Sequence, residues 1–229
     1  MEVLSGPNLR EYRRALLGEP RGAAWDAVVD GLAPTTRLAP GTGTAGAPLE
    51  APAGSAAMEA LLAIVGDLCD VLAFLHGKGL VHRDLKPDNV LIRPGGGPVL
   101  VDFGLTARFS GASGREALQP VGDVEGTLAY MAPEQCLGEL VDARTDLFGL
   151  GRVLIECVTG SPNTRPEQMG TDAPWSRIAA GLTSPDPASR YPDAEALCRD
   201  LDAVRAGRQP LGPLGYGYGG PRHAAVRLA

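Results

Sequence analysis

The sequence predicts a mainly α-helical fold with one small β-hairpin. Three observations support this fold class. Apolar residues recur at three- and four-residue steps between residues 58 and 78, as on the buried face of an amphipathic helix. The apolar segment "TDLFGLGRVLIECVTG" is long enough for a helix that is buried on most sides. Two short apolar runs, "NVLI" and "PVLVDFG", flank "RPGGG", which is typical of a hairpin connection.

The composition limits the classes of function. The chain has 229 residues, 44% of them hydrophobic, so it can bury a sizeable core. The net charge of −6 argues against a nucleic-acid partner, because Lys and Arg are not in surplus. No apolar run approaches the roughly 20 residues of a membrane-spanning helix, so we expect no membrane segment. The four scattered cysteines predict reduced thiols and a cytoplasmic location rather than a disulfide framework.

The first part of the chain combines a short helical start with a low-complexity segment. "NLREYRRALL" has its apolar residues at helical spacing, and Asn8 is suited to cap this helix. "AAWDAVVDGL" favours a second short helix. Residues 33–57 are rich in Pro and Gly, so we expect a flexible surface insertion there.

The rest of the chain reads as one helical domain. Residues 58–78 form the clearest helix, which Gly77 is expected to end. Two shorter helices are expected near "DAPWSRIAAGL" and "DAEALCRDLDAV". Residues 208–229 include "GPLGYGYGGPR" and are expected to be a disordered tail, which leaves residues 1–207 as the domain.

The segment "VHRDLKPDNVLI", residues 81–92, gathers groups suited to phosphate and metal chemistry between two apolar runs. Further motifs follow it in order. They are "DFG" at 102–104, "GTLAYMAPE" at 126–134, "DLFGLG" at 146–151 and "DPASRY" at 186–191. Each motif alone is a weak signal, but their common order and spacing make coincidence a poor explanation.

Together these motifs resemble those of the Hanks-type serine/threonine protein kinases, and the Gly-, Pro-, Ala- and Arg-rich composition favours a bacterial member. The resemblance covers roughly residues 1–206 apart from the insertion. It implies the C-terminal lobe of a protein kinase domain, with the hairpin at the catalytic loop. The implied activity is transfer of the γ-phosphate of ATP to Ser or Thr hydroxyls of a protein substrate, with Mg²⁺ as cofactor.

The resemblance implies a catalytic role for Asp84, Lys86, Asn89 and Thr127 and a cofactor-binding role for Asp102. Asp84 would accept the proton of the substrate hydroxyl, and Lys86 would place a positive charge near the transferred phosphate. Thr127 would bridge Asp84 and Lys86. Asn89 and Asp102 would offer oxygen ligands to Mg²⁺ on the nucleotide phosphates, and Lys86, Asn89 and Asp102 would thereby bind ATP. A lysine at this position of the family goes with Ser/Thr rather than Tyr targets.

Other motif residues are interpreted as supporting the site. By the resemblance, His82 and Phe103 are packing residues of an apolar column beneath it. Glu134 and Arg190 would form a buried ion pair that holds the substrate-binding segment. Asp146 would accept backbone N–H bonds from the catalytic loop.

A regulatory switch is a further implication. Arg83 would pair with a phosphate on the segment after Gly104, with Ser110, Ser113 and Thr127 as candidate acceptors. The alternative is that this segment is not regulated by phosphorylation.

Kinases of this family also have a mostly β N-terminal lobe with a Gly-rich loop and a strand lysine. Neither precedes residue 81, and "GTGTAG" at 41–46 lacks the flanking strands. "MEVLSGPNL" resembles the hinge between the two lobes, which would place Glu2 and Leu4 at the adenine edge and Asn8 near the ribose. We therefore expect the N-terminal lobe to be absent. A start codon assigned too far downstream, a truncated gene and a natural fragment would each explain it.

Three functions remain open from the sequence. The retained Asp84, Lys86, Asn89 and Asp102 favour an active protein kinase. The missing lobe favours an inactive pseudokinase that serves as a binding module, and it predicts weak binding of ATP and little turnover. A small-molecule kinase of the aminoglycoside or choline type would use similar residues, but Lys86 and the "APE" segment argue against it.

Overall fold

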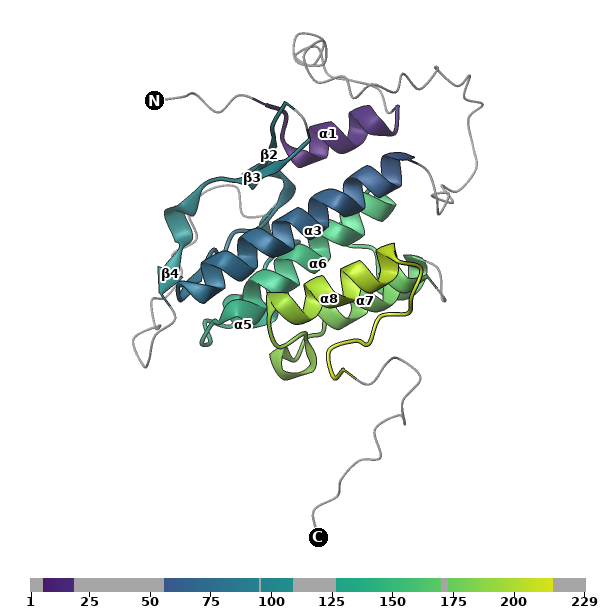
Figure 1. Cartoon of the computed structure of the whole chain (residues 1–229). Helices are drawn as coiled ribbons and strands as arrows, with labels where there is room; N and C mark the ends of the chain where they lie inside the picture. Colours follow the sequence, from purple (N-terminus) through teal and green to yellow (C-terminus); the bar gives the residue numbers. More distant parts are fainter. Residues whose placement is uncertain (1–5, 19–55, 95, 109–126, 170–172, 216–229) are drawn as a thin grey trace.

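The computed structural model describes residues 6–18, 56–94, 96–108, 127–169 and 173–215. Within these ranges the protein is mainly helical. Two long helices, α3 (Ala56–Gly77) and α6 (Ala143–Thr159), pack against each other at the centre (Figure 1). Helix α8 (Ala194–Arg205) packs along α3, and α7 (Pro174–Leu182) packs on α6. Figure 1 shows α7 and α8 on the side of this central pair that faces away from β2 and β3.

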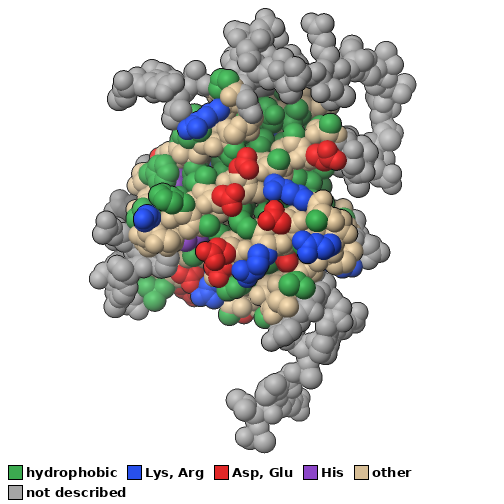
Figure 2. Space-filling view, viewed as in Figure 1, with side chains coloured by type: hydrophobic (Ala, Val, Ile, Leu, Met, Phe, Trp, Pro, Cys, Tyr) green, Lys and Arg blue, Asp and Glu red, His purple; other side chains and the backbone are tan. Residues whose placement is uncertain are grey.

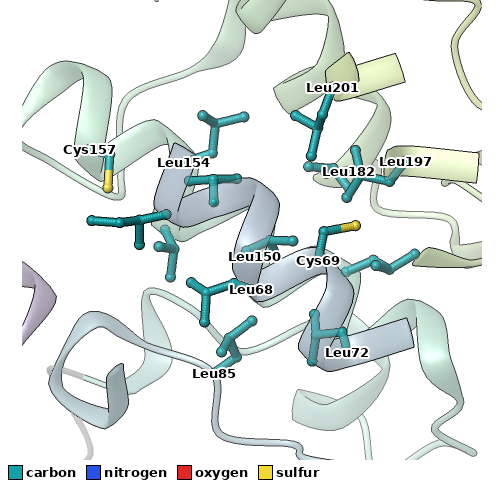
Figure 3. Close-up of a cluster of buried hydrophobic side chains, with 14 of the residues drawn as sticks. Leu68, Cys69, Leu72, Leu85, Leu150, Leu154, Cys157, Leu182, Leu197 and Leu201 are labelled. Atoms are coloured by element: carbon teal, nitrogen blue, oxygen red, sulfur yellow. The ribbon is translucent and has the colours of Figure 1, made fainter. Parts of the chain in front are cut away.

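The central helices form because their apolar residues share a buried face. In α3 the side chains of Leu61, Val65, Leu68 and Leu72 are fully buried, as their helical spacing predicts. Figure 3 shows leucines of α3, α6, α7 and α8 meeting in one cluster. This cluster is the core on which the shorter segments are fixed.

Two short antiparallel strand pairs lie beside the helices. Strand β2 (Val90–Ile92) pairs with β3 (Pro98–Leu100), so the two runs expected to form a hairpin do pair. Strand β1 (Leu80–Val81) pairs with β4 (Ala107–Arg108), and the sequence did not predict this pair. The backbone N–H of Ile92 donates to the carbonyl of Pro7 at 2.9 Å, which attaches β2 to the segment before α1.

Several shorter helices complete the described part. Helix α1 (Leu9–Leu16) lies next to β2, and α5 (Pro133–Cys136) is a single turn. The 3₁₀ turns are η1 (Pro87–Asn89), η2 (Phe103–Leu105), η3 (Pro166–Met169) and η4 (Pro187–Ser189). The helices expected around residues 9–17, 145–160, 174–182 and 193–204 are confirmed.

Two expected boundaries need correction. Helix α3 begins at Ala56, so the last two residues of the expected 33–57 insertion are helical, and Ala57 is buried. The expected disordered tail begins too early, because residues 208–215 are ordered. The Asp200 carboxylate accepts the backbone N–H groups of Leu211 at 2.7 Å and Gly212 at 2.6 Å. Residues 33–55, the helix expected in "AAWDAVVDGL" and residues 216–229 lie outside the described residues.

The surface carries charges of both signs, and the described helices are not of the membrane-spanning kind. Acidic and basic side chains are interspersed over the face that α3 and α8 present in Figure 2. Among the described helices, none combines the length and the apolar character needed to cross a membrane.

The expected cap of α1 is present, and we expect it to stabilise the folded protein. Asn8 Oδ1 accepts the N–H of Glu11 and Glu11 Oε2 accepts the N–H of Asn8, both at 3.0 Å, which is a capping box. Asn8→Ala should therefore lower the free energy of unfolding by about 1 kcal/mol. Urea denaturation measures this loss, and the exposed Arg14→Ala in the same helix is the control. An unchanged urea midpoint in Asn8→Ala would show that the cap contributes nothing.

Candidate functional site

The segment from β1 to β2 brings Asp84, Lys86 and Asn89 together. The Asp84 carboxylate is 9% exposed and receives Lys86 Nζ at 2.9 Å. Asn89 Nδ2 donates to Asp84 Oδ2 and to the Asp84 carbonyl, both at 2.8 Å. A charge-assisted contact and two hydrogen bonds therefore fix the orientation of one partly accessible carboxylate. The geometry confirms that these residues form a cluster, while their catalytic roles remain predictions.

The Asn89 amide is oriented by these bonds. Because Nδ2 is engaged with Asp84, the amide oxygen Oδ1 is left for another partner. The backbone carbonyl of Asn89 accepts the N–H of Val101 at 2.9 Å, which ties this segment to the end of β3. Asp102 follows directly, is exposed, and has a left-handed backbone with φ 60° and ψ 73°.

An amide oxygen and a carboxylate are ligands of the kind that Mg²⁺ prefers. Mg²⁺ usually takes one or two protein carboxylates and completes its shell with waters and substrate phosphates. Asn89 and Asp102 fit that pattern. Within the described ranges no three His, Cys, Asp or Glu side chains gather as a metal site, and the metal-binding role of Asn89 and Asp102 remains a prediction.

Thr127 contacts the lysine of the cluster. Lys86 Nζ donates to Thr127 Oγ1 at 3.2 Å and lies 2.9 Å from Asp84. The expected bridge between Asp84 and Lys86 is thus arranged differently, because the ammonium group has three donors and lies between the hydroxyl and the carboxylate. A segment far along the chain is thereby attached to the cluster.

His82 lies beneath the cluster and has both ring nitrogens engaged. Its Nδ1 accepts the N–H of Asp84 at 3.3 Å, so Nε2 carries the hydrogen and donates to the carbonyl of Val101 at 3.1 Å. The rings of His82 and Phe103 meet edge to face with centroids 5.0 Å apart. This contact agrees with the expected packing role, although Phe103 is still 48% exposed.

Asp146 of α6 anchors the same segment from below. Its carboxylate is 1% exposed and accepts the backbone N–H groups of His82 and Arg83, each at 2.8 Å, as the sequence predicts. The histidine His76 at the end of α3 binds the same carboxylate through Nε2 at 2.9 Å. Arg83 has φ 73°, a left-handed conformation that costs a non-glycine residue about 1–2 kcal/mol. The bonds from the N–H groups of His82 and Arg83 to Asp146 hold the backbone in this conformation.

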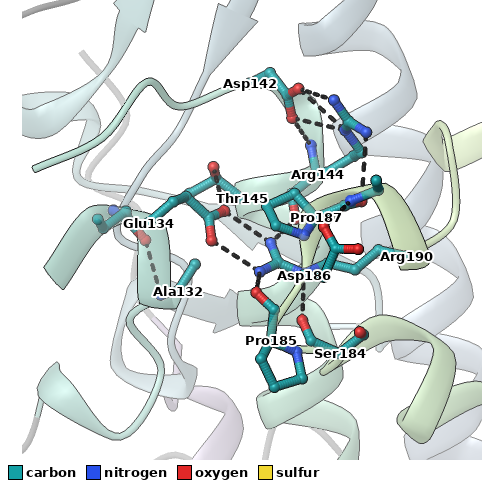
Figure 4. A network of polar contacts seen from close by, with 12 residues as sticks. Ala132, Glu134, Asp142, Arg144, Thr145, Ser184, Pro185, Asp186, Pro187 and Arg190 are labelled. Atoms are coloured by element: carbon teal, nitrogen blue, oxygen red, sulfur yellow. Dashed lines mark hydrogen bonds and ion pairs between the residues drawn. The ribbon is translucent and has the colours of Figure 1, made fainter. Parts of the chain in front are cut away.

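The ion pair expected between Glu134 and Arg190 is present and buried. Figure 4 shows the guanidinium facing the carboxylate of α5, with Arg190 Nη1 and Nη2 at 2.7 and 2.8 Å from the two carboxylate oxygens. Arg190 also donates to backbone carbonyls, and Thr145 Oγ1 donates to Glu134 at 2.9 Å. Burial alone would raise the pKa of Glu134, but the hydrogen bonds and charge of Arg190 outweigh it and lower this pKa.

A polar network that the sequence does not predict surrounds Arg10 of α1. Arg10 donates to Glu156 of α6 at 2.8 Å, to Asp88 at 2.9 Å and to the Tyr130 hydroxyl at 2.9 Å. The Tyr130 hydroxyl donates to Glu156, and burial followed by this bond raises the pKa of Tyr130. Arg10 is 78 to 146 residues from these partners in the chain, so no local pattern predicts the network.

The contacts of Gln135 and His76 with this segment were also not predicted from the sequence. Gln135 Nε2 donates to the backbone carbonyl of Arg83 at 2.9 Å, while its Oε1 accepts the N–H of Ala132 at 3.1 Å. Together with Asp146, this bond fixes both polar groups of the Arg83 backbone. A glutamine next to "APE" and a histidine at the end of a helix carry no signal of such contacts.

Other expected site residues either lie outside the described part of the chain or make different contacts. Glu2, Leu4, Ser110 and Ser113 lie outside the described residues. The side chain of Asn8 caps α1, and its predicted place near a ribose remains a prediction. Arg83 Nε is buried with no hydrogen-bond partner within the described part of the chain.

Known proteins share these segments. Residues 48–197 match the model of the protein kinase domain. The serine/threonine-protein kinase PknB of Mycobacterium tuberculosis (strain H37Rv) is 39% identical over 141 residues, which cover 62% of this chain and 21% of that protein. PknB of Mycolicibacterium smegmatis is 34% identical over 180 residues, covering 70% and 28%.

The serine/threonine-protein kinase PknL of Mycobacterium tuberculosis is 33% identical over 165 residues, which cover 63% of this chain and 40% of that protein. The chain therefore spans about a fifth to two fifths of the curated relatives that it matches. The matched domain contains the Asp84 cluster, Asp102 and the Glu134–Arg190 pair. These relatives are named serine/threonine-protein kinases and come from bacteria, and this chain belongs to the protein kinase family.

Proposed function

We propose that this chain supplies the catalytic residues of a bacterial serine/threonine protein kinase. The observation that carries the proposal is the Asp84 carboxylate, held by Lys86 and Asn89 in a segment that α6 anchors. The two PknB relatives and PknL are named serine/threonine-protein kinases, which supports the same reaction for this chain.

The cluster can orient and deprotonate a hydroxyl. Asp84 is the one carboxylate of the cluster that Lys86 and Asn89 both hold, so a hydroxyl donating to its free lone pairs would be directed for attack. Lys86 supplies a compact positive charge beside that position, where negative charge grows during phosphoryl transfer. Positioning and charge neutralisation are the main demands of this reaction.

ATP bound with Mg²⁺ would supply the phosphoryl group and the neutralising metal charge. The Asn89 amide oxygen and the Asp102 carboxylate are the residues that would hold the metal. The engaged Nδ2 of Asn89 keeps its oxygen free for that purpose. We further propose a protein substrate and a cytoplasmic location, where ATP is available and the four free cysteines are reduced unless an oxidant acts on them.

The function is tested by phosphotransfer with product analysis. The 229-residue protein is incubated with millimolar Mg²⁺ and γ-labelled ATP and a mixed protein acceptor. Phosphoserine and phosphothreonine should be labelled, phosphotyrosine should not, and EDTA should abolish the labelling. Label in phosphotyrosine alone, or no label above a protein-free control, would contradict the proposal. The second outcome, combined with retained partner binding, would identify a pseudokinase.

The proposed role of Asp102 as a metal ligand predicts how the Mg²⁺ requirement should change when its charge is removed. Asp102→Asn removes the only charged ligand of the proposed pair, so half-maximal transfer should need at least about ten times more Mg²⁺. A Mg²⁺ titration at fixed ATP measures this shift. Asp67→Asn, which changes an exposed carboxylate on α3, is the matched control and should leave the titration unchanged. Equal titrations for Asp102→Asn and the unaltered protein would rule out Asp102 as a ligand.

A further inference from the structure

Two cysteines from distant parts of the chain meet where α3 packs on α8. Cys69 lies in the middle of α3 and is fully buried, while Cys198 lies in α8 and is partly exposed. Their Sγ atoms are 2.7 Å apart, although 129 positions separate them in the sequence. Figure 3 shows Cys69 beside Leu197, the neighbour of Cys198 in α8.

The two sulfurs are close to bonding distance. A disulfide bond has a length of about 2.05 Å, so the sulfurs need to approach by only about 0.7 Å more. The remaining two thiols have no such neighbour among the described residues: Cys136 is exposed and Cys157 is buried elsewhere in the core. The meeting of thiols is therefore particular to one pair.

We propose that Cys69 and Cys198 form a site of reversible oxidation, at which a disulfide bond cross-links α3 to α8. The oxidant is a peroxide such as hydrogen peroxide. Cys198 Sγ takes one peroxide oxygen and becomes a sulfenic acid, and the first water leaves. Cys69 Sγ then attacks the Cys198 sulfur, whose hydroxyl leaves as the second water. The two thiols lose two hydrogens and two electrons in total, and the peroxide is reduced to water.

The environment of each thiol sets the order of these steps. Cys198 is the member of the pair that solvent reaches, so it meets the oxidant first. Cys69 donates a hydrogen bond to the carbonyl of Ala194 at 3.1 Å. The hydrogen bond with Cys198, then burial, and then the charges of Cys198 and Asp70 raise the pKa of Cys69. Cys69 is therefore protonated at neutral pH, and it reacts only with an already oxidised neighbour.

The cross-link would join the first long helix of the core to the last one. Closing a loop of this length restricts the unfolded chain strongly, so the oxidised protein should melt at a temperature on the order of 10 °C higher. The site lies at the interface of α3 and α8 and involves no residue of the Asp84 cluster. This inference therefore stands or falls independently of the proposed phosphotransfer.

Peptide mapping of the oxidised protein is the direct test. The protein is treated with hydrogen peroxide and denatured in the presence of N-ethylmaleimide, which alkylates the remaining free thiols. It is then digested with trypsin without reduction. We expect peptides 38–78 and 191–199 to appear as one cross-linked species that dithiothreitol separates. Recovery of both as maleimide adducts, or pairing of Cys69 with a cysteine other than Cys198, would overturn the proposal.

Two variants extend the test to stability. Cys136→Ser should retain the cross-link and the rise in melting temperature, because Cys136 is exposed and takes no part in the Cys69–Cys198 contact. Cys198→Ser should lose both, and its reduced form should melt close to the reduced unaltered protein, because Ser differs little in size. A rise in melting temperature that persists in Cys198→Ser would contradict the assigned site.

Discussion

Replacing Asp84 with Asn is expected to lower phosphotransfer by about 10²- to 10⁴-fold, the usual contribution of a positioned general base. The amide has nearly the shape of the carboxylate, so the contacts with Lys86 and Asn89 lose charge but little packing. The loss should therefore appear in kcat, with a melting temperature within a few degrees of the unaltered protein. Initial rates with labelled ATP and a protein acceptor measure it.

The control for this experiment is Asp67→Asn, which makes the same chemical change on the exposed face of α3. It should retain full activity. Asp84→Asn with an unchanged rate would mean that Asp84 only stabilises the loop. In that case the hydrogen bonds that Asp146 accepts from the loop backbone would be the main reason for the shape of this segment.

The two backbone hydrogen bonds that Asp146 accepts would fix the loop whether or not Asp84 takes part in the reaction.

Glu134→Gln is expected to lower the free energy of unfolding by about 3–5 kcal/mol, because it leaves the charge of Arg190 buried without a counter-charge. Arg190 is fully enclosed, and its other hydrogen-bond partners are uncharged backbone carbonyls of residues 144, 184 and 185. The melting temperature should fall by roughly 10 °C or more for a domain of this size. Urea denaturation and thermal melting both measure the effect.

Glu139→Gln makes the same change on an exposed residue nearby and should alter the stability by less than about 0.5 kcal/mol. If Glu134→Gln were as stable as Glu139→Gln, the buried pair would contribute no net stabilisation. Arg190→Lys gives an intermediate case, because it keeps the charge but loses the two-pronged contact with the carboxylate.

The pH dependence of this effect has a definite sign. The pKa of Glu134 is lower in the folded protein than its usual value of 4.5, so folding favours the ionised carboxylate. The stabilisation is fully present above about pH 4.5 and is lost as the pH falls through the lower folded pKa. The stability difference between Glu134→Gln and the unaltered protein should therefore shrink in acid, below pH 4.5.

The helices were predictable because their signals are local. Asn8 precedes the apolar face of α1 with Glu11 three positions later, and the spacing of Leu61, Val65 and Leu68 in α3 is the spacing of a buried helix face. The cluster around Asp84 was predictable for a similar reason. Asp84, Lys86 and Asn89 lie within six consecutive residues, so a single loop brings them together.

Contacts between distant segments were harder to predict. β1 and β4 have two residues each, too few to show an alternating pattern, and their partners are about 27 positions apart. Arg10 binds Glu156 across 146 positions, and Cys69 meets Cys198 across 129. Such pairs depend on how α1, α3, α6 and α8 pack, and no short motif records that packing. Glu134 and Arg190 were found only because the family resemblance connects their motifs.

The anchor at Asp200 has a practical consequence for handling the protein. Its bonds to the backbone of Leu211 and Gly212 fix the chain beside α7, where Pro213 packs against Gly181. In Figure 1 this side of the molecule faces away from β2 and β3, and the Asp84 loop leads directly into β2. A biotin or resin linker attached beyond Gly215 would therefore immobilise the molecule with the proposed nucleotide site open to the solution.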